Sequence, residues 1–261
     1  MVENALASTQ PPELTLVMPV LNDGPRVIPA ICTLAFTVQV PLTLLVVYDR
    51  EEDTTLPVLE GLREVFPSIR LVRNRGKRVI GAIRTGFGEC KTEVVGIWVP
   101  YHVDPHGLVN KMYALVRDHD CQLVSGNRFN RIRRVSRGTP LKKLLSRGGN
   151  WLLNRVIGVP LGDITTSLKL YRRSFIERHP LKTEDTGGWA LSTEFAVKAA
   201  ERGYKMGEVE FLPENVNMIL GVSNFQVLGQ LGQYLKWLLW GLRRRKVIRA
   251  NYRVAENFVR I

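Results

Sequence analysis

The chain has 261 residues, of which 45% are hydrophobic and 23% are charged, so it can bury one large core or at most two small ones. Lysine and arginine outnumber the acidic residues by 37 to 24, and this composition excludes disordered and collagen-like chains. The three cysteines, Cys32, Cys90 and Cys121, lack metal-ligand spacing. They therefore favour neither a disulfide framework nor a zinc ribbon, and they indicate a reducing, cytoplasmic compartment.

Two kinds of hydrophobic pattern alternate through the first half of the chain. Apolar runs typical of buried strands cover 14–20, 42–48, 69–72, 94–98 and 122–125, and helical spacing covers 27–37, 54–66, 78–90 and 105–118. Strands that alternate with helices predict an α/β fold with a mainly parallel central sheet flanked by helices. Ligands of such sheets bind beyond the carboxyl ends of the strands, so we expect a site near Asn22, Asp49 and residues 99–104.

The second half has a different character. It predicts a basic amphipathic helix over 140–157, strands over 168–171 and 204–211, and a helix over 194–202. A last amphipathic helix, 226–242, carries Tyr234, Trp237 and Trp240 and is followed by the basic run 243–246. We therefore divide the chain into a domain of residues 1–225 and a basic helical extension of residues 226–261.

The aromatic rings beside a basic run are typical of a helix that lies on an anionic bilayer. The alternative is a helix that packs its aromatic side chains on the domain. No segment is apolar and long enough to span a membrane, and no signal peptide is visible. We expect a cytoplasmic protein, or one bound peripherally to the cytoplasmic face of the membrane.

Positive charge is concentrated in two zones. Eight basic residues and no acid lie from Arg128 to Arg147, and eight more lie from residue 216 to the C terminus against Glu256 alone. Such zones indicate polyanionic partners, namely phosphates, anionic lipid head groups or nucleic acid. The alternative is a solvated charged surface. The chain has no recognised nucleic-acid-reading motif, so we do not expect nucleic acid as the partner.

A series of segments, taken in order, resembles the motifs of the family-2 glycosyltransferases with the GT-A fold. Residues 19–23 (PVLND) are similar to that family's PxYNE, 48–55 (YDREEDTT) to DDGSxDGT, and 75–87, with RGK and GAIRTGF, to RGKGxAxxxGF. Residues 124–129 (VSGNRF), 145–151 (LSRGGNW) and 163–173 (DITTSLKLYRR) resemble segments of the polyprenyl-phosphate branch, which includes the dolichol-phosphate mannosyltransferases. The resemblance covers roughly 14–225 and implies the Rossmann-like GT-A fold.

The resemblance implies a nucleotide-sugar donor lying across the strand ends. The positions that match the donor site are Pro19, Leu21, Asn22, Asp49, Lys77, Arg84 and Tyr101. Among them, Asp49 would accept a hydrogen bond from the base, and its alternative role is to cap a turn.

The resemblance also implies an acceptor that carries a phosphate, either a polyprenyl phosphate or a small molecule. The positions matching the acceptor-phosphate site are Arg128, Lys142, Ser146 and Arg147. A phosphate monoester, with a second pKa of about 6, is largely deprotonated at neutral pH and needs little general base. Asp163 and Glu194 match acidic positions at the reaction site and are the candidate catalytic residues. Asp163 would orient a substrate or act as a base toward a hydroxyl acceptor, or else cap a turn.

The chain departs from the family where a DxD motif binds Mg²⁺ or Mn²⁺. The corresponding residues are Trp-Val-Pro (98–100) or Val-Pro-Tyr (99–101), which offer no ligand for a hard cation. Tyr48 replaces the first acid of the second-strand motif, and Asn215 or Asn217 and Asn224 replace basic residues of the family.

Three explanations stay open. His102 and Asp104 would form a shifted Mg²⁺ or Mn²⁺ site. Alternatively, the enzyme works without a metal and cations such as Lys77, Arg78 or Arg84 stabilise the leaving group. In the third, the ordinary donor chemistry is lost. The sequence favours a glycosyltransferase, inverting by resemblance, and the alternative is a non-catalytic or repurposed relative that binds a nucleotide, a lipid phosphate or a partner protein.

Overall fold

The computed structural model describes residues 6–104, 106–129, 147–211, 227–253 and 255–261. Eight strands form one sheet in the order β3-β2-β1-β4-β6-β5-β7-β8. Their bounds are β1 Leu14–Val20, β2 Leu42–Tyr48, β3 Ile69–Arg73, β4 Val94–Ile97, β5 Leu123–Asn127, β6 Lys169–Arg172, β7 Met206–Glu210 and β8 Phe258–Arg260. Strand β6 is antiparallel to β4 and β5, and the other neighbouring pairs are parallel. The expected α/β fold with a mainly parallel sheet is confirmed.

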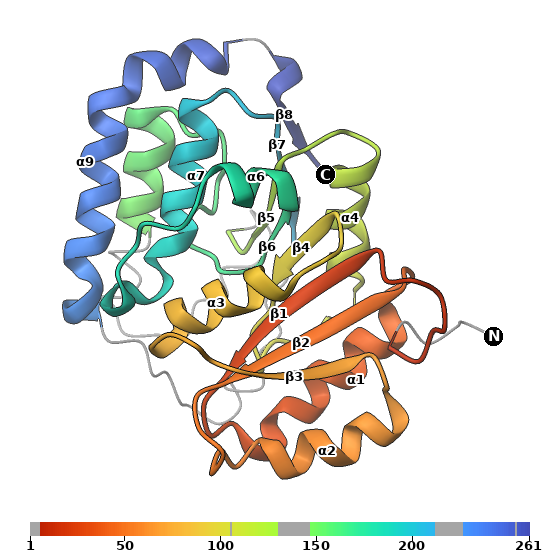
Figure 1. The fold of residues 1–261 in the computed structure, drawn as a ribbon. Coiled ribbons are helices and arrows are strands. Elements are labelled where there is room, and N and C mark those ends of the chain that lie inside the picture. The colour runs from red at the N-terminus through yellow and green to blue at the C-terminus, as the bar shows by residue number, and fades with distance from the viewer. Residues whose placement is uncertain (1–5, 105, 130–146, 212–226, 254) are drawn as a thin grey trace.

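Helices cover both faces of the sheet (Figure 1). On one face lie α1 Val27–Thr37, α2 Leu56–Val65 and α4 Leu108–Arg117. The other face carries α3 Arg78–Glu89, α6 Arg173–Arg178, α7 Leu191–Glu201 and α9 Val227–Asn251, together with the short π-helix η2 Leu152–Ile157. In β1, Leu16 and Met18 pack into the first core and Val17 into the second, because successive side chains of a strand point to opposite faces.

Most expected elements are present, with bounds that differ by up to three residues. The helix expected from residue 105 begins at Leu108, because Gly107 adopts a left-handed backbone (φ 63°) and the Asp104 carboxylate caps the first turn. Residues 140–146 of the expected basic helix lie outside the described residues, and 147–151 are helical and continue into η2. Helix α6 and strand β8 were not expected.

The C-terminal segment belongs to the same packing unit as the rest. Helix α9 packs against α7, η2 and the 3₁₀ segment η3 Asp185–Ala190, and β8 extends the sheet by pairing in parallel with β7. The helix expected to end at Leu242 continues to Asn251, so the basic run 243–246 is helical and does not follow the helix. The expected domain boundary at 225 lies outside the described residues. Across the described ranges, no helix has both the length and the apolar character needed to cross a bilayer.

Candidate active site

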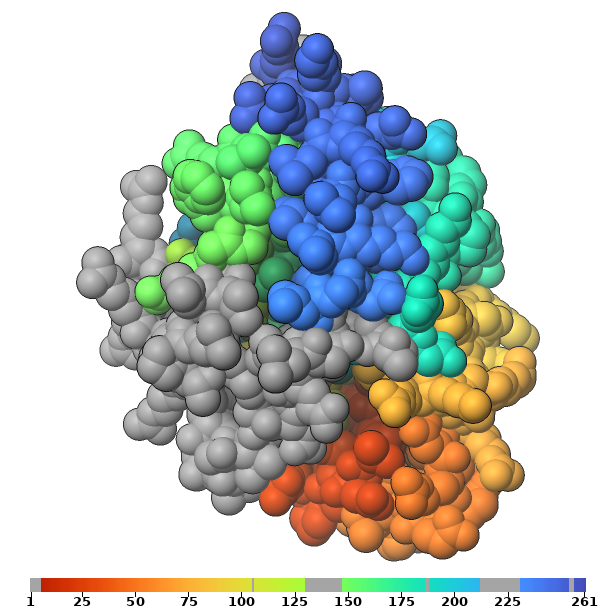
Figure 2. All heavy atoms as spheres, turned by 90° about the vertical axis from the view of Figure 1, so that its left-hand side faces the viewer, coloured from red at the N-terminus to blue at the C-terminus, as the bar shows by residue number. Residues whose placement is uncertain are grey.

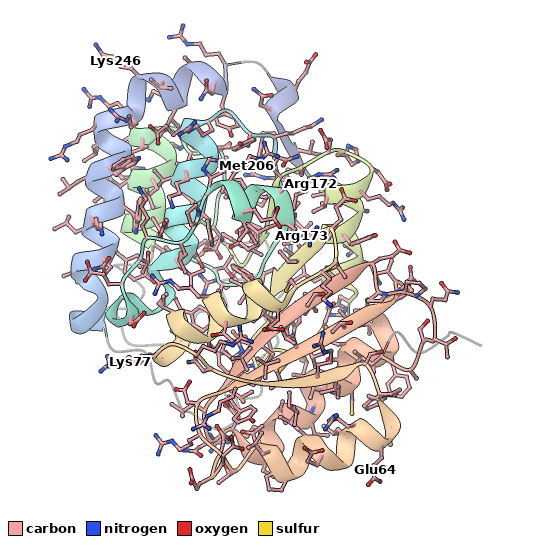
Figure 3. The ribbon with its side chains drawn as sticks, in the orientation of Figure 1. Glu64, Lys77, Arg172, Arg173, Met206 and Lys246 are labelled. Atoms are coloured by element: carbon pink, nitrogen blue, oxygen red, sulfur yellow. The ribbon has the colours of Figure 1, made fainter. Side chains whose placement is uncertain are left out.

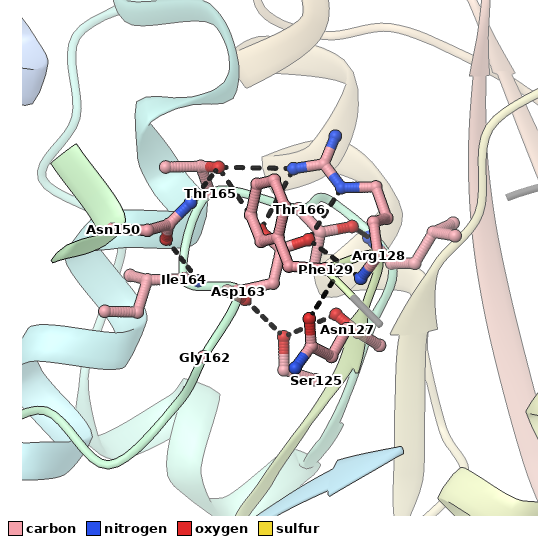
Figure 4. A network of polar contacts seen from close by, with 12 residues as sticks. Ser125, Asn127, Arg128, Phe129, Asn150, Gly162, Asp163, Ile164, Thr165 and Thr166 are labelled. Atoms are coloured by element: carbon pink, nitrogen blue, oxygen red, sulfur yellow. Dashed lines mark hydrogen bonds and ion pairs between the residues drawn. The ribbon is translucent and has the colours of Figure 1, made fainter. Parts of the chain in front are cut away.

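The carboxyl ends of β4 and β5 and the loop that precedes β6 meet at one place. Strand β5 ends at Asn127 and leads directly into Arg128, while the loop of residues 162–168 returns the chain antiparallel to β5. Gly162 makes this close approach possible, since a Cβ there would lie 2.8 Å from the Asn127 Nδ2 atom. The loop therefore delivers Asp163 next to Arg128 (Figure 4).

Arg128 and Asp163 form a bidentate ion pair. The Arg128 Nε donates to Asp163 Oδ2 at 2.6 Å, and Nη2 donates to Oδ1 at 3.0 Å. The backbone N–H of Arg128 also donates to Oδ2 (3.2 Å), and Nη2 reaches the Thr165 hydroxyl oxygen (3.2 Å). Burial alone would raise the pKa of the Asp163 carboxyl, but the charge and hydrogen bonds of Arg128 bring it below its ordinary value. Asp163 is thus an ionised carboxylate that holds the guanidinium in one orientation.

The pair is asymmetric in its exposure. The Asp163 side chain is fully buried, whereas 37% of the Arg128 side chain is exposed. No described residue accepts a hydrogen bond from Arg128 Nη1. The outer edge of the guanidinium can therefore donate to an anion while its inner edge stays bound to Asp163.

Two buried titratable side chains, Glu208 and Lys169, position the loop that carries Asp163. The Glu208 carboxylate of β7 accepts hydrogen bonds from the N–H groups of Gly162 (2.6 Å) and Asp163 (3.1 Å), and Arg260 of β8 pairs with its other oxygen at 2.6 Å. From β6, Lys169 Nζ donates to the carbonyls of Ile164 (3.1 Å) and Thr166 (2.8 Å). The loop is thus fixed by β6, β7 and, through Glu208, the C-terminal strand β8.

Lys169 is buried completely and also donates to the Ser125 hydroxyl oxygen at 2.9 Å. Burial lowers the pKa of its amine to about 7, although the charges of Asp163 and Glu208 act in the opposite direction. From the helical segment beside η2, Asn150 donates to the Thr165 hydroxyl and accepts from the N–H of Ile164 (2.7 Å). These residues were not singled out as site residues from the sequence, although Lys169 and Asn150 lie within its recognised motifs.

Besides Asp163 and Lys169, three further side chains lie within electrostatic range of Arg128. Tyr101 and His102 follow β4, and Tyr234 lies on α9. Burial raises the pKa of the Tyr101 hydroxyl to about 12, and the charge of Asp23, in the loop after β1, also acts on it. The Arg128 pair therefore lies between the strand ends on the donor side and the inner edge of α9.

On the donor side, the loops after β1 and β2 are tied together. The Asn22 N–H donates to both oxygens of the buried Asp53 carboxylate at 3.1 Å, and the Thr55 hydroxyl oxygen accepts from Asp23 N–H at 2.9 Å. Asn22 adopts a left-handed backbone (φ 53°), which asparagine tolerates well. Next to it, Pro19 is half-buried in β1 and Leu21 is exposed.

The remaining donor candidates form a second group. Asp49 Oδ1 accepts a hydrogen bond from Asn74 Nδ2 at 2.6 Å, which joins the ends of β2 and β3. Lys77 lies at the start of α3, and its side chain is exposed (Figure 3). Asn74, which the sequence did not single out, also accepts the N–H of Gly76 (2.8 Å) and so orders the turn that leads to Lys77.

Arg84 and Glu194 both contact residues 182–185, at the start of η3. Arg84 pairs with Asp185 (2.8 Å) and donates to the Thr183 carbonyl (2.6 Å). The fully buried Glu194 carboxylate accepts from the N–H groups of Lys182 and Thr183, both at 2.6 Å, and from the Lys198 ammonium. No contact within the described residues joins Glu194 to the Arg128–Asp163 pair.

His102 and Asp104 do not fit a metal site in this arrangement. Asp104 accepts the N–H groups of Leu108 (2.6 Å) and Val109 (3.0 Å), so its carboxylate caps α4. The His102 ring packs against Trp98 and Phe211, at centroid distances of 5.0 and 5.3 Å, and burial lowers its pKa to about 3.

At the DxD positions, Trp98 and Val99 are buried and carry no carboxylate. The described part of the chain contains no cluster of three or more His, Cys, Asp or Glu side chains that would hold a metal ion. The acceptor candidates Lys142 and Ser146 lie outside the described residues. Arg147 is described and exposed, at the start of the helical segment 147–151.

Comparison with known proteins shows the family and the fold of the chain. Residues 15–179 match the model of the family described as glycosyl transferase family 2. The chain is 25% identical over 249 residues to a polyprenol monophosphomannose synthase of Mycolicibacterium smegmatis, covering 92% of this chain and 91% of that protein. It is 30% identical over 164 residues to a dolichyl-phosphate hexose transferase of Haloferax volcanii, covering 58% of this chain and 66% of that protein.

The chain is also similar to a dodecaprenyl-phosphate galacturonate synthase of Rhizobium johnstonii, with 30% identity over 182 residues, 66% of this chain and 51% of that protein. Among solved structures, it resembles glucosyl-3-phosphoglycerate synthase from Mycobacterium tuberculosis in complex with Mn²⁺, UDP-glucose and phosphoglyceric acid. The TM-score is 0.62 at 17% identity, over 94% of this chain and 82% of that one. This likeness shows the fold, and the expected GT-A architecture is confirmed.

Proposed function

The chain belongs to glycosyl transferase family 2, and from this membership we propose that it transfers a sugar from a nucleotide-sugar donor to the phosphate of a polyprenyl phosphate. The names of the three curated relatives, all polyprenol- or dolichol-linked, support a lipid phosphate over a small phosphorylated acceptor. In this reaction an acceptor phosphate oxygen forms a bond to the anomeric carbon, the bond from that carbon to the donor diphosphate breaks, and a nucleoside diphosphate leaves. The proposal predicts inversion at that carbon.

One observation carries the proposal, which is that both oxygens of Asp163 are engaged by Arg128 in a buried, bidentate pair. A carboxylate with a lowered pKa and no exposed oxygen is badly placed to take a proton from a hydroxyl acceptor. A phosphate monoester, in contrast, arrives already ionised and needs a cation to position it. The partly exposed side chain of Arg128 offers that cation, and Arg147 is exposed at the start of the neighbouring helical segment.

On the donor side, we propose that diphosphate departure does not depend on a cation bound at the end of β4. The side chains there are apolar or already committed to capping and ring packing. The cations at the start of α3, Lys77 and Arg78, are exposed and close in sequence to the Asp49–Asn74 contact. They would offset the negative charge that develops on the departing diphosphate.

The proposal is tested by transfer assays with UDP-, GDP-, dTDP- and CMP-linked sugars, in EDTA and in Mg²⁺ or Mn²⁺. The acceptors are a polyprenyl phosphate and the matching polyprenol, which lacks the phosphate. We expect transfer to the phosphate only, and transfer that persists in EDTA. Equal transfer to the polyprenol would contradict the acceptor assignment, and activity abolished by EDTA would contradict the donor assignment.

The matched variants are Arg128→Ala and Arg63→Ala. Arg63 is a half-exposed arginine on α2 whose ion pair with Glu60 lies on the surface, so its loss should leave kcat/KM unchanged. Hydrogen bonds to a charged group contribute about 1.5–3 kcal/mol each, so Arg128→Ala should lower kcat/KM for the phosphate acceptor by about 10- to 100-fold. Equal kcat/KM values for the two variants would refute the role of Arg128.

A further inference from the structure

Helix α9 presents an apolar stripe to solvent. Leu231, Leu235 and Leu239 are 45%, 49% and 44% exposed. At about 100° per residue, they fall within an arc of about 80° on the helix surface. On the opposite side of the helix, Trp237 and Ile248 are buried against the domain. These three side chains therefore face solvent, and the stripe ends before Leu242, which falls in the same arc but packs against the second core.

Exposure also corrects the expectation for the aromatic residues of this helix. Trp237 is only 2% exposed, and its Nε1 donates to the Thr183 hydroxyl oxygen at 3.0 Å. Trp240 is partly exposed, but its Nε1 is bound to Glu201 (2.9 Å). Leucines, and not the indole of Trp237, form the outward apolar surface.

Toward the C-terminal end of α9, cations lie on the arc of the stripe at Lys246 and about 40° to either side of it at Arg243 and Arg245. The helix contains no acidic residue, and the helical repeat places Lys246 on the arc of the stripe. Lys246 points outward in Figure 3. No described residue forms an ion pair with Arg243, Arg245 or Lys246, all of which are exposed. We call these three cations, together with Leu231, Leu235 and Leu239, the α9 face.

The α9 face has an apolar neighbour. Residues 147–157 pack beside α9 through η2, and in Figure 2 the two segments lie side by side on one side of the molecule. Trp151, in this neighbouring segment, is 62% exposed, and Arg147 is exposed four residues earlier. Single apolar residues scattered over a surface are ordinary, whereas large exposed apolar side chains grouped with cations mark an interaction surface.

The inner edge of α9 borders the candidate active site. Tyr234 is half-buried, directly precedes Leu235, and lies within electrostatic range of Arg128. Burial raises the pKa of the Tyr234 hydroxyl, so the side chain stays neutral at physiological pH. The charge of Arg128 therefore acts on the residue that directly precedes Leu235 of the leucine stripe.

We propose that the α9 face docks on an anionic phospholipid bilayer, with the leucines among the upper acyl chains and the three cations against lipid phosphates. Docking in this orientation brings Arg128 to the bilayer surface, where the phosphate of a polyprenyl acceptor would lie. The inference rests on the proposed function for the identity of the acceptor. Docking on the bilayer itself requires no acceptor. Charge complementarity favours an anionic bilayer, because a strip of leucines beside exposed cations matches apolar chains beneath anionic head groups.

The test is co-sedimentation of the full chain with acceptor-free vesicles. One set contains phosphatidylcholine alone, and the other includes about 30% phosphatidylglycerol, which supplies the negative surface potential. We expect the chain to bind the anionic vesicles. This binding should weaken as the salt concentration rises, because salt screens the attraction between the cations and the anionic head groups. Wild-type chain that stays in the supernatant with both vesicle types would overturn the proposal.

Matched variants test which surface binds. In Leu235→Ser/Leu239→Ser both substitutions are on exposed side chains, and we expect vesicle affinity to fall by at least about tenfold. Phe36→Ser is the control, since Phe36 is 65% exposed on α1, which covers the other face of the sheet. Equal binding by the two variants would refute the α9 face as the docking surface. So would a wild-type dimer, detected by light scattering, that the leucine substitutions dissociate.

A separate measurement distinguishes failure of docking from failure of the proposed function. Transfer by the wild-type chain to a short-chain, water-soluble polyprenyl phosphate reports on the reaction without a bilayer. Failure of that reaction, with vesicle binding intact, would contradict the function and leave docking supported. Transfer to the soluble acceptor without vesicle binding would contradict docking alone.

Discussion

The buried amine of Lys169 predicts a specific dependence of stability on pH. In the unfolded chain a lysine keeps its proton up to about pH 10.5, whereas burial lowers the pKa of Lys169 in the folded chain to about 7. Between these values the unfolded state binds one more proton than the native state, so the free energy of unfolding rises with pH. Below pH of about 7 both states are protonated, and the unfavourable burial of the charge is present in full.

The size of the effect follows from the two pKa values. Each pH unit between them contributes about 1.4 kcal/mol, so raising the pH from about 6 to about 8.5 should stabilise the fold by about 2 kcal/mol through Lys169. Lys169→Met removes this contribution while keeping a long apolar side chain. The substitution also leaves the Ile164 and Thr166 carbonyls without their donor. The slope with pH, and not the absolute stability, therefore tests the reasoning.

The assay is urea denaturation followed by tryptophan fluorescence at several pH values. Lys111→Met, on the exposed surface of α4, is the matched control and should keep the wild-type slope. A difference of about 2 kcal/mol in pH response between Lys169→Met and the control would support a largely uncharged amine at pH 8.5. Identical slopes for the two variants would refute it, and would mean that Asp163 and Glu208 keep Lys169 charged.

Three further results are expected. Glu208→Gln should lower kcat/KM for the phosphate acceptor by about tenfold while leaving nucleotide-sugar affinity unchanged, because it loosens the loop that carries Asp163 and the ion pair with Arg260, and neither contacts the donor candidates. Steady-state kinetics and donor titration check this, and a matching loss of donor affinity would count against it. Asp104→Ala should destabilise the fold by about 1–2 kcal/mol, because α4 loses its cap. Urea denaturation measures this change. A new dependence of the variant's activity on Mn²⁺ concentration would argue against the capping role. Glu194→Gln should shift the fluorescence of Trp237, whose indole binds the same Thr183 hydroxyl, and an unchanged spectrum would show that the contact is dispensable.

The first half of the fold could be predicted closely because its signals are local. Strands β1 and β2 and helix α1 have the predicted bounds, since each is an apolar run ended by turn-forming residues. Strand β8 could not be predicted in this way. It has three residues, and it is stabilised by pairing with β7 and by the Arg260–Glu208 ion pair, which depend on the tertiary structure.

Individual residues of the site could be predicted from the sequence, but the contacts between them could not. Arg128 and Asp163 were each singled out from motifs, yet their pairing joins residues 35 positions apart and follows only from the return of the chain along β6. The roles of His102 and Asp104 depend on neighbours that a sequence pattern does not reveal, namely the Trp98 and Phe211 rings and the N–H groups of α4. Similarly, the amphipathic pattern predicted α9 but did not show which side of it faces the domain.

The most direct test of the central claim is ³¹P NMR of a polyprenyl phosphate incubated with the chain and the nucleotide-sugar that it binds. The account predicts that the phosphomonoester signal is replaced by that of a sugar phosphodiester as nucleoside diphosphate appears in equal amount. Consumption of the donor while the monoester signal persists would contradict it, because the sugar would then have gone to water or to an acceptor other than the phosphate.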